Sequence, residues 1–159
     1  MPRLKIQILI QADRKIVFDL ARSIDLHQIS TEQTNEKAIA GKTKGLIGLG
    51  ESVTWRAKHF GVYQKLTSKV TEMDSPNYFV DEMQKGAFKE FRHEHHFEES
   101  NGETLMIDIF EYISPLRILG KLADSLFLKK YMTDLLIKRN DIIKEFAETE
   151  KWKQICCDN

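Results

Sequence analysis

Residues 88–112 contain the side chains best able to do chemistry, in two runs that alternate like strands. The runs flank Asn101-Gly102, a dipeptide that strongly favours a β-hairpin with a two-residue turn. Such a turn places His95 directly opposite Asp108, with His93 one pleat further along the same face. The hairpin therefore brings two imidazoles and a carboxylate together among aromatic rings. The full set of predicted pairs is Ser100 with Glu103, Phe97 with Met106, His95 with Asp108, His93 with Phe110, and Phe91 with Tyr112.

A carboxylate beside an imidazole suggests three roles. Asp108 could fix the tautomer of His95 and make it a general acid or base, or a charge-assisted donor to a ligand. The pair could equally be a buried polar contact whose members only satisfy each other. His93 and His95 could also form a two-histidine, one-carboxylate metal site with Asp81 or Asp108. We assign no metal ion and no cofactor from the sequence.

Two further turns extend the inward face of this hairpin to its neighbours. Phe60-Gly61 and residues 74–77 both carry turn residues that fix strand register. All strands agree on one inward face if the connection at Gly86 is odd in length or bulged, which glycine permits. The pairs that this register predicts are Trp55 with Leu66, Val53 with Ser68, Val70 with Asp81, Glu72 with Phe79, and Ser68 with Met83.

Length and charge exclude several classes of protein. The chain has 159 residues, which is enough for one domain with a substantial core. Lys+Arg and Asp+Glu are both 24, whereas a protein that binds a nucleic-acid backbone needs an excess of cations. No apolar run approaches the length of a membrane span, and the N-terminal segment alternates like a strand rather than a signal peptide. We therefore predict a cytoplasmic protein with no nucleic-acid partner and no membrane span.

The rest of the chain predicts more strands, two short helices and one long helix. Residues 3–11 alternate as a strand, and Asp13 and Ser23 can cap the two short helices that follow. A strand is expected over residues 36–40, then a glycine-rich loop over residues 41–50. For His27, on the second short helix, we predict only a capping or packing role.

The last helix is expected to run from Pro115 to about Glu148, because apolar residues recur there at helical spacing. A helix of this length must lie across the sheet to bury that face. Lys138-Arg139 is assigned to its solvated side. The adjacent Cys156 and Cys157 predict a reduced, frayed terminus rather than a disulfide. We expect one domain over residues 1–149 and a tail over residues 150–159.

This order of elements resembles the helix-grip fold of the START-like superfamily, also called SRPBCC, and in particular its small bacterial proteins. The resemblance covers roughly residues 6–146 and rests on VFDLARSIDLHQ, GLIGLGESVTWRAKHFG, FVDEMQKGAFKEFRHEHHFEE and LADSLFLKKYMTDLLIKRN. It implies an α+β fold of type β-α-α-β6-α, in which a curved antiparallel sheet of about seven strands wraps around the C-terminal helix.

The superfamily includes pollen-allergen and plant-hormone-binding proteins and the polyketide cyclase/dehydrase group. The resemblance therefore implies a cavity for apolar or amphipathic molecules between the sheet and the long helix, but it brings no catalytic motif. In some members a glycine-rich loop flanks the cavity entrance. By analogy, the loop over residues 41–50 could gate the cavity.

We therefore expect the protein to bind a small hydrophobic or amphipathic molecule in an internal cavity. One alternative is a cyclase- or dehydratase-type enzyme that uses His95 and Asp108 as general acid and base. A second is a protein–protein interaction module, such as a chaperone cofactor. The sequence identifies neither the ligand nor the oligomeric state. The predicted ligand-binding residues are Trp55, Leu66, Ser68, Phe79, Asp81, Met83, Phe91, His93, His95, Met106, Asp108, Phe110 and Tyr112.

Overall fold

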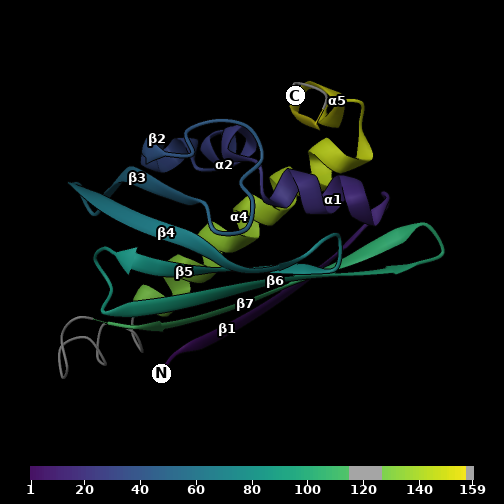
Figure 1. Ribbon diagram of the computed structural model, residues 1–159. Helices are drawn as coiled ribbons and strands as arrows, with labels where there is room; N and C mark the ends of the chain where they lie inside the picture. Colours follow the sequence, from purple (N-terminus) through teal and green to yellow (C-terminus); the bar gives the residue numbers. More distant parts are fainter. Residues whose placement is uncertain (115–126, 157–159) are drawn as a thin grey trace.

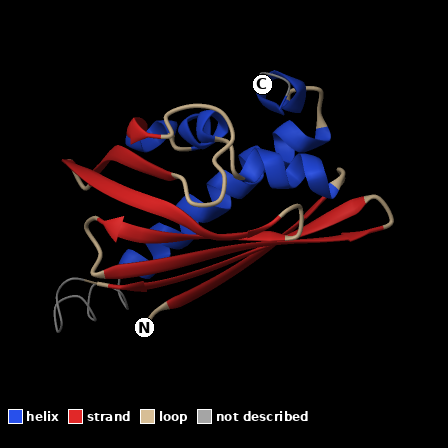
Figure 2. Cartoon of the chain, viewed as in Figure 1, coloured by secondary structure: helices blue, strands red, loops and turns tan. Residues whose placement is uncertain are grey.

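A seven-stranded antiparallel sheet forms the body of the protein in a computed structural model, which describes residues 1–114 and 127–156 (Figures 1 and 2). The strand order is β1-β7-β6-β5-β4-β3-β2, so six strands follow one another as a meander and the first strand pairs with the last. The strands are β1 (Arg3–Ile10), β2 (Lys37–Gly41), β3 (Ser52–His59), β4 (Val62–Asp74), β5 (Tyr78–Lys85), β6 (Glu90–Ser100) and β7 (Glu103–Ile113).

The helices gather on one face of the sheet. Figure 1 shows the long helix crossing the strands, and the two short N-terminal helices contact it near one end. The caps of the short helices are confirmed, because Asp13 accepts from the N–H of Lys15 and Ser23 from that of Leu26. The helices are α1 (Arg14–Ala21), α2 (Ile24–Ser30), the 3-10 helix η1 (Glu32–Thr34), α4 (Lys129–Glu148) and α5 (Trp152–Cys156). The predicted helix start at Pro115 lies outside the described residues.

The central hairpin has the predicted register. His95 pairs with Asp108 and His93 with Phe110, and the same register runs from Glu90 to Ser100. Asn101 and Gly102 both have positive φ, 54° and 78°, as a two-residue hairpin turn requires. His93, His95 and Asp108 therefore share one face of the sheet.

One predicted pair is wrong. Val70 pairs with Asp81, but Glu72 pairs with Val80 rather than with Phe79, which faces Met73. The turn between Asp74 and Tyr78 encloses an odd number of residues, which shifts the pairing by one residue relative to the prediction. A bulge between Val70 and Glu72 reverses this shift, so that Val70 again pairs with Asp81. The connection between β5 and β6 keeps the predicted inward residues on one face, because Phe79 pairs with His95 and Asp81 with His93.

The core lies between the helices and the inward face of the sheet. Phe18 and Leu20 of α1 and Ile143 of α4 are buried there against residues of the sheet. The frayed terminus predicted for the chain end is wrong for α5, because Trp152 and Cys156 pack against this core. Cys156 is partly buried, and Cys157 lies outside the described residues. None of the helices within residues 1–114 and 127–156 is long and apolar enough to cross a membrane.

Candidate functional site

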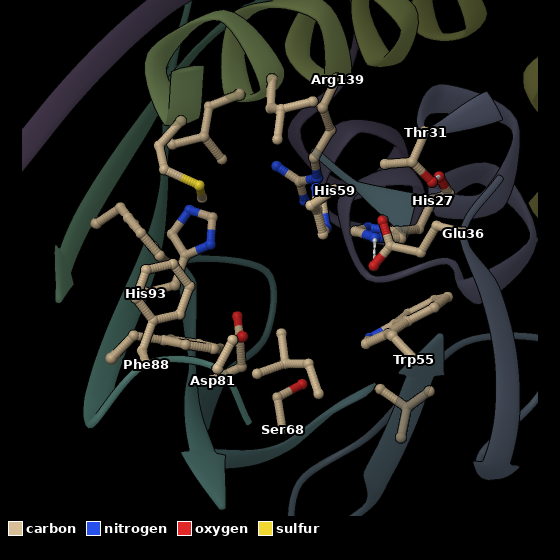
Figure 3. A pocket seen from close by; sticks show the side chains of 18 of the residues that line it. His27, Thr31, Glu36, Trp55, His59, Ser68, Asp81, Phe88, His93 and Arg139 are labelled. Carbon is tan, nitrogen blue, oxygen red and sulfur yellow. Dashed lines mark hydrogen bonds and ion pairs between the residues drawn. The ribbon is translucent and has the colours of Figure 1, made fainter. Parts of the chain in front are cut away.

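A cavity of about 680 Å³ lies between the inward face of the sheet and α4 (Figure 3). This volume is in the range that suits a small organic ligand. Strands β3 to β6 supply much of the wall, and α2, α4 and the segments between elements contribute to the rest. The predicted ligand-binding residues that line it are Trp55, Leu66, Ser68, Phe79, Asp81, Phe91, His93, His95 and Phe110.

Four predicted ligand-binding residues do not line the cavity: Met83, Met106, Asp108 and Tyr112. Met106, Asp108 and Tyr112 are buried, and the last two are inward residues of β7. Helix α4 passes over β7 at this point, since the side-chain amide of Asn140 donates to Oδ2 of Asp108 at 2.5 Å. Helix α4 therefore covers Asp108 and separates it from the cavity.

The central cluster consists of ionisable and amide side chains from β5, β6, β7 and α4. His95 lies between two carboxylates: its Nε2 is 2.9 Å from Oδ1 of Asp81, and its Nδ1 is 2.8 Å from Oδ1 of Asp108. Nε2 of His93 is 3.1 Å from the same oxygen of Asp108. Asp108 is therefore the hub that the other groups share. The members of the central cluster are Asp81, His93, His95, Asp108, Arg139 and Asn140.

Arg139 is the fixed cation of the central cluster, and its predicted place on the solvated side of the helix is wrong. Only 7% of it is exposed, Nη2 donates to the backbone oxygen of Ala21 at 2.9 Å, and Nη1 is 3.7 Å from Asp108. The helical period explains this position, because residues 139 and 140 lie between Leu136 and Ile143 on the buried face. That spacing was the signal in the sequence that pointed to Arg139.

The central cluster holds its carboxyl groups ionised. Burial alone would raise the pKa of Asp108, but hydrogen bonds with His93 and His95 and their charges hold it well below its ordinary value. Burial likewise opposes ionisation of Asp81, yet the hydrogen bond with His95 and the charges of both histidines lower its pKa. Two carboxylates are thus stable in a buried site because donors surround them.

The two histidines are shifted in opposite directions. Burial lowers the pKa of His93, and the charge of His95 lowers it further. Burial also disfavours the His95 cation, but hydrogen bonds with Asp108 and Asp81 outweigh it and raise the pKa of His95. The rings are adjacent, with centroids 3.8 Å apart. The cluster therefore favours one imidazolium, at His95, over two.

The surroundings of the two ring nitrogens of His95 differ. Nε2 is in a hydrogen bond with Asp81, whereas Nδ1 is buried 2.8 Å from Oδ1 of Asp108 without a well-aligned hydrogen bond. His93 also lines the cavity and uses Nε2 toward Asp108. One ligand atom each from Asp81, His93 and His95 lies within 4.8 Å of the others, a spacing that could hold a metal ion. Such an ion would have to displace the hydrogen bond between His95 and Asp81.

A second polar group lines another wall of the cavity, and no pattern in the sequence had indicated it. In the Glu36 cluster, Nε2 of His27 lies 3.4 Å from Oε1 of Glu36, and Nδ1 of His59 lies 2.7 Å from the hydroxyl of Tyr131. Figure 3 shows Glu36 and His27 beside Trp55, across the view from His93. The Glu36 cluster consists of His27, Glu36, His59 and Tyr131.

The Glu36 cluster also has shifted pKa values. Burial would raise the pKa of Glu36, but the charge and hydrogen bond of His27, with a smaller effect of His59, lower it. Burial lowers the pKa of His59 despite the charge of Glu36. His27 does pack as predicted, since its ring lies 4.3 Å from that of Trp55 between centroids. Its place in the cavity wall goes beyond that prediction.

Some aromatic side chains that line the cavity are also exposed at the protein surface. Phe60 and Phe127 both line the cavity, yet 56% and 57% of them are exposed. The ring of Phe60 lies 4.6 Å from that of Tyr131. Of the loop over residues 41–50, only Ile47 lines the cavity, so gating by that loop stays a prediction.

Comparison with known proteins finds relatives in structure only. No protein-family model matches the sequence, and no curated protein matches it. Among solved structures, TTHA0849 from Thermus thermophilus is similar with a TM-score of 0.75 and 17% identity, over 92% of this chain and 97% of that one. Ginseng major latex-like protein 151 from Panax ginseng gives 0.68 and 15%, over 93% and 98%.

A third similar structure is protein CV1439 from Chromobacterium violaceum, with a TM-score of 0.70 and 8% identity over 92% of this chain and 97% of that one. Identities this low show the fold alone. The likeness nevertheless extends over nearly the whole of each chain, and the sheet, the short helices and the long helix agree with the expected order. The chain therefore has the helix-grip fold.

Proposed function

We propose that the protein binds a small hydrophobic or amphipathic molecule in the cavity between the sheet and α4. The observation that carries this proposal is the cavity itself, about 680 Å³ with mainly apolar walls and a few polar groups that face it. Burial of apolar ligand surface supplies the affinity, at about 25 cal/mol for each Å² removed from water.

The polar groups of the wall orient the ligand in this proposal. Asp81, His93 and His95 line the cavity beside Arg139, so a ligand hydroxyl or carbonyl has both acceptors and donors within the central cluster. Asp108 contributes indirectly, because it fixes the positions of both imidazoles from behind the wall. The cyclase or dehydratase alternative receives less support, since Asp108, its proposed partner for His95, does not line the cavity.

A cavity-filling variant tests the proposal. Leu66 lines the cavity, whereas the neighbouring Lys65 is exposed on the same strand. With the uncharged fluorescent probe N-phenyl-1-naphthylamine, we expect Leu66→Trp to lose about tenfold or more in affinity, because the indole occupies the probe's volume. Lys65→Trp serves as the matched control and should bind the probe as the wild type does.

Native mass spectrometry of the freshly purified protein adds an independent check. A co-purified small molecule that is retained by Lys65→Trp and lost from Leu66→Trp is the expected result. Equal probe binding by the wild type and both variants, with no molecule retained by any of them, would overturn the proposal. Circular dichroism of each variant establishes that it is folded.

A further inference from the structure

The two polar clusters of the cavity wall differ in how their charges are balanced. In the central cluster, Asp81 and Asp108 face a fixed cation, Arg139, and the imidazolium that the two carboxylates favour at His95. The guanidinium of Arg139 stays positively charged whatever the state of the histidines, and the side-chain amide of Asn140 donates a hydrogen bond to Asp108. The central cluster can therefore be buried without a ligand charge.

Glu36 has no such fixed cation. Its ion pair within the described residues is with His27 at 3.4 Å, and no lysine or arginine there pairs with it. The side chain of Glu36 is only 13% exposed, and it lines the cavity. An imidazole is positively charged only while it is protonated, unlike the guanidinium of Arg139. Burial of a carboxylate without a permanent counter-charge costs free energy. A cationic group of a ligand would therefore stabilise this wall of the cavity.

The aromatic side chains around Glu36 favour the same kind of group. Trp55 lines the cavity beside Glu36 in Figure 3, and Phe60 and Tyr131 line it as well. The faces of aromatic rings attract cations through their quadrupole, and tryptophan does so most strongly. A carboxylate next to such rings is the combination of groups that recognises an ammonium ion.

We propose that the Glu36 cluster, with Trp55, binds the ammonium group of an amphipathic amine whose apolar part fills the cavity. This inference rests on the proposed function and gives it a ligand class. The ammonium forms a charge-assisted hydrogen bond to Glu36. The alkyl or aryl part of the amine lies against the apolar wall that includes Leu66 and Phe79.

Three probes with one shared ten-carbon chain test the inference: decylamine, decanol and decanoate. Isothermal titration calorimetry at pH 7.5 measures their affinities for the full chain. We expect decylamine to bind about tenfold tighter than decanol, and decanoate to bind weakest, because a hydrogen bond to a charged group typically contributes that much. Glu36→Gln should remove the preference for decylamine over decanol.

Glu32→Gln is the matched control, since it removes the same charge from an exposed position close to Glu36 in sequence. It should keep the preference of the wild type. Trp55→Phe is a second variant, expected to weaken decylamine binding more than decanol binding, because phenylalanine is the weaker partner for a cation. The wild-type ranking of the three probes tests the inference even if a variant fails to fold.

The outcomes separate the two proposals. If decanol binds as tightly as decylamine, the amine inference is overturned while binding of an apolar ligand stands. If the preference for decylamine survives in Glu36→Gln, Glu36 is not its cause and the inference is likewise overturned. If none of the three probes binds the wild type, both proposals fail together.

Discussion

The central cluster and the Glu36 cluster border the same cavity but play different parts in the molecule. The first joins β5, β6 and β7 to α4 through Asp108, whose side chain is fully buried. The second joins α2, β3 and the first turn of α4 through contacts that remain partly exposed. Balanced charges allow a polar group to hold a fold together, whereas an unbalanced charge in a cavity wall is suited to a ligand.

Removal of Asp108 should have the largest effect on this comparison. We expect Asp108→Asn to lower the free energy of unfolding by about 3–5 kcal/mol, because it leaves buried cations without their counter-charge. Urea denaturation followed by circular dichroism measures the loss. The matched control is Asp134→Asn, an exposed position on α4 that should change little. A small loss at Asp108 would mean that the central cluster does not hold the fold.

Substitution of Arg139 should have the second-largest effect on stability. We expect Arg139→Met to lower the free energy of unfolding by about 2 kcal/mol, because the variant loses the hydrogen bond to Ala21 and a counter-charge for Asp108. The apolar part of the side chain stays packed in both proteins. Lys138→Met alters the neighbouring, exposed residue of the same helix and should leave stability near that of the wild type. Equal effects of the two substitutions would contradict the buried position of Arg139.

The two histidines of the central cluster offer a smaller effect, visible as a difference in titration. By NMR, His95 should titrate above its ordinary pKa of about 6.5 and His93 below it. The sign for stability follows: His95 stabilises the fold below that pH and ceases to do so as the pH rises through its folded-state pKa. His93, favoured as the neutral form, acts in the opposite direction and destabilises as the pH falls. A reversed order would show that Asp108 and Asp81 do not favour the cation of His95.

The sequence predicted the fold and the central cluster better than it predicted the Glu36 cluster. Hairpin turns fix strand register within a few residues, so the opposition of His95 and Asp108 could be derived by counting from Asn101-Gly102. The bulge at residues 70–72 could not, because no residue type there requires it. Contacts between elements far apart in the chain leave no spacing to count, which is why the contact of His59 with Tyr131 was missed.

Arg139 lies between these two cases. Its burial could have been derived from the helical period that places it between Leu136 and Ile143, but the charge of its side chain suggested solvent. A charged residue within an apolar stripe therefore indicates a buried counter-charge elsewhere in the fold. Here that counter-charge was Asp108, already predicted to face inward on β7.

The smallest expected change in stability belongs to Glu36→Gln, and it depends on pH. Contacts with His27 lower the pKa of Glu36 despite its burial, so the carboxylate stabilises the fold above the ordinary pKa of 4.5 and ceases to do so as the pH falls through its folded-state pKa. We expect the variant to lower the free energy of unfolding by about 1 kcal/mol at pH 7.5 and by less at pH 3, as the carboxyl group takes up its proton. Urea denaturation at both values, with Glu32→Gln as the control, measures the difference. A loss at pH 7.5 as large as that of Asp108→Asn would mean that Glu36 has a permanent counter-charge after all, and the contrast between the two clusters would disappear.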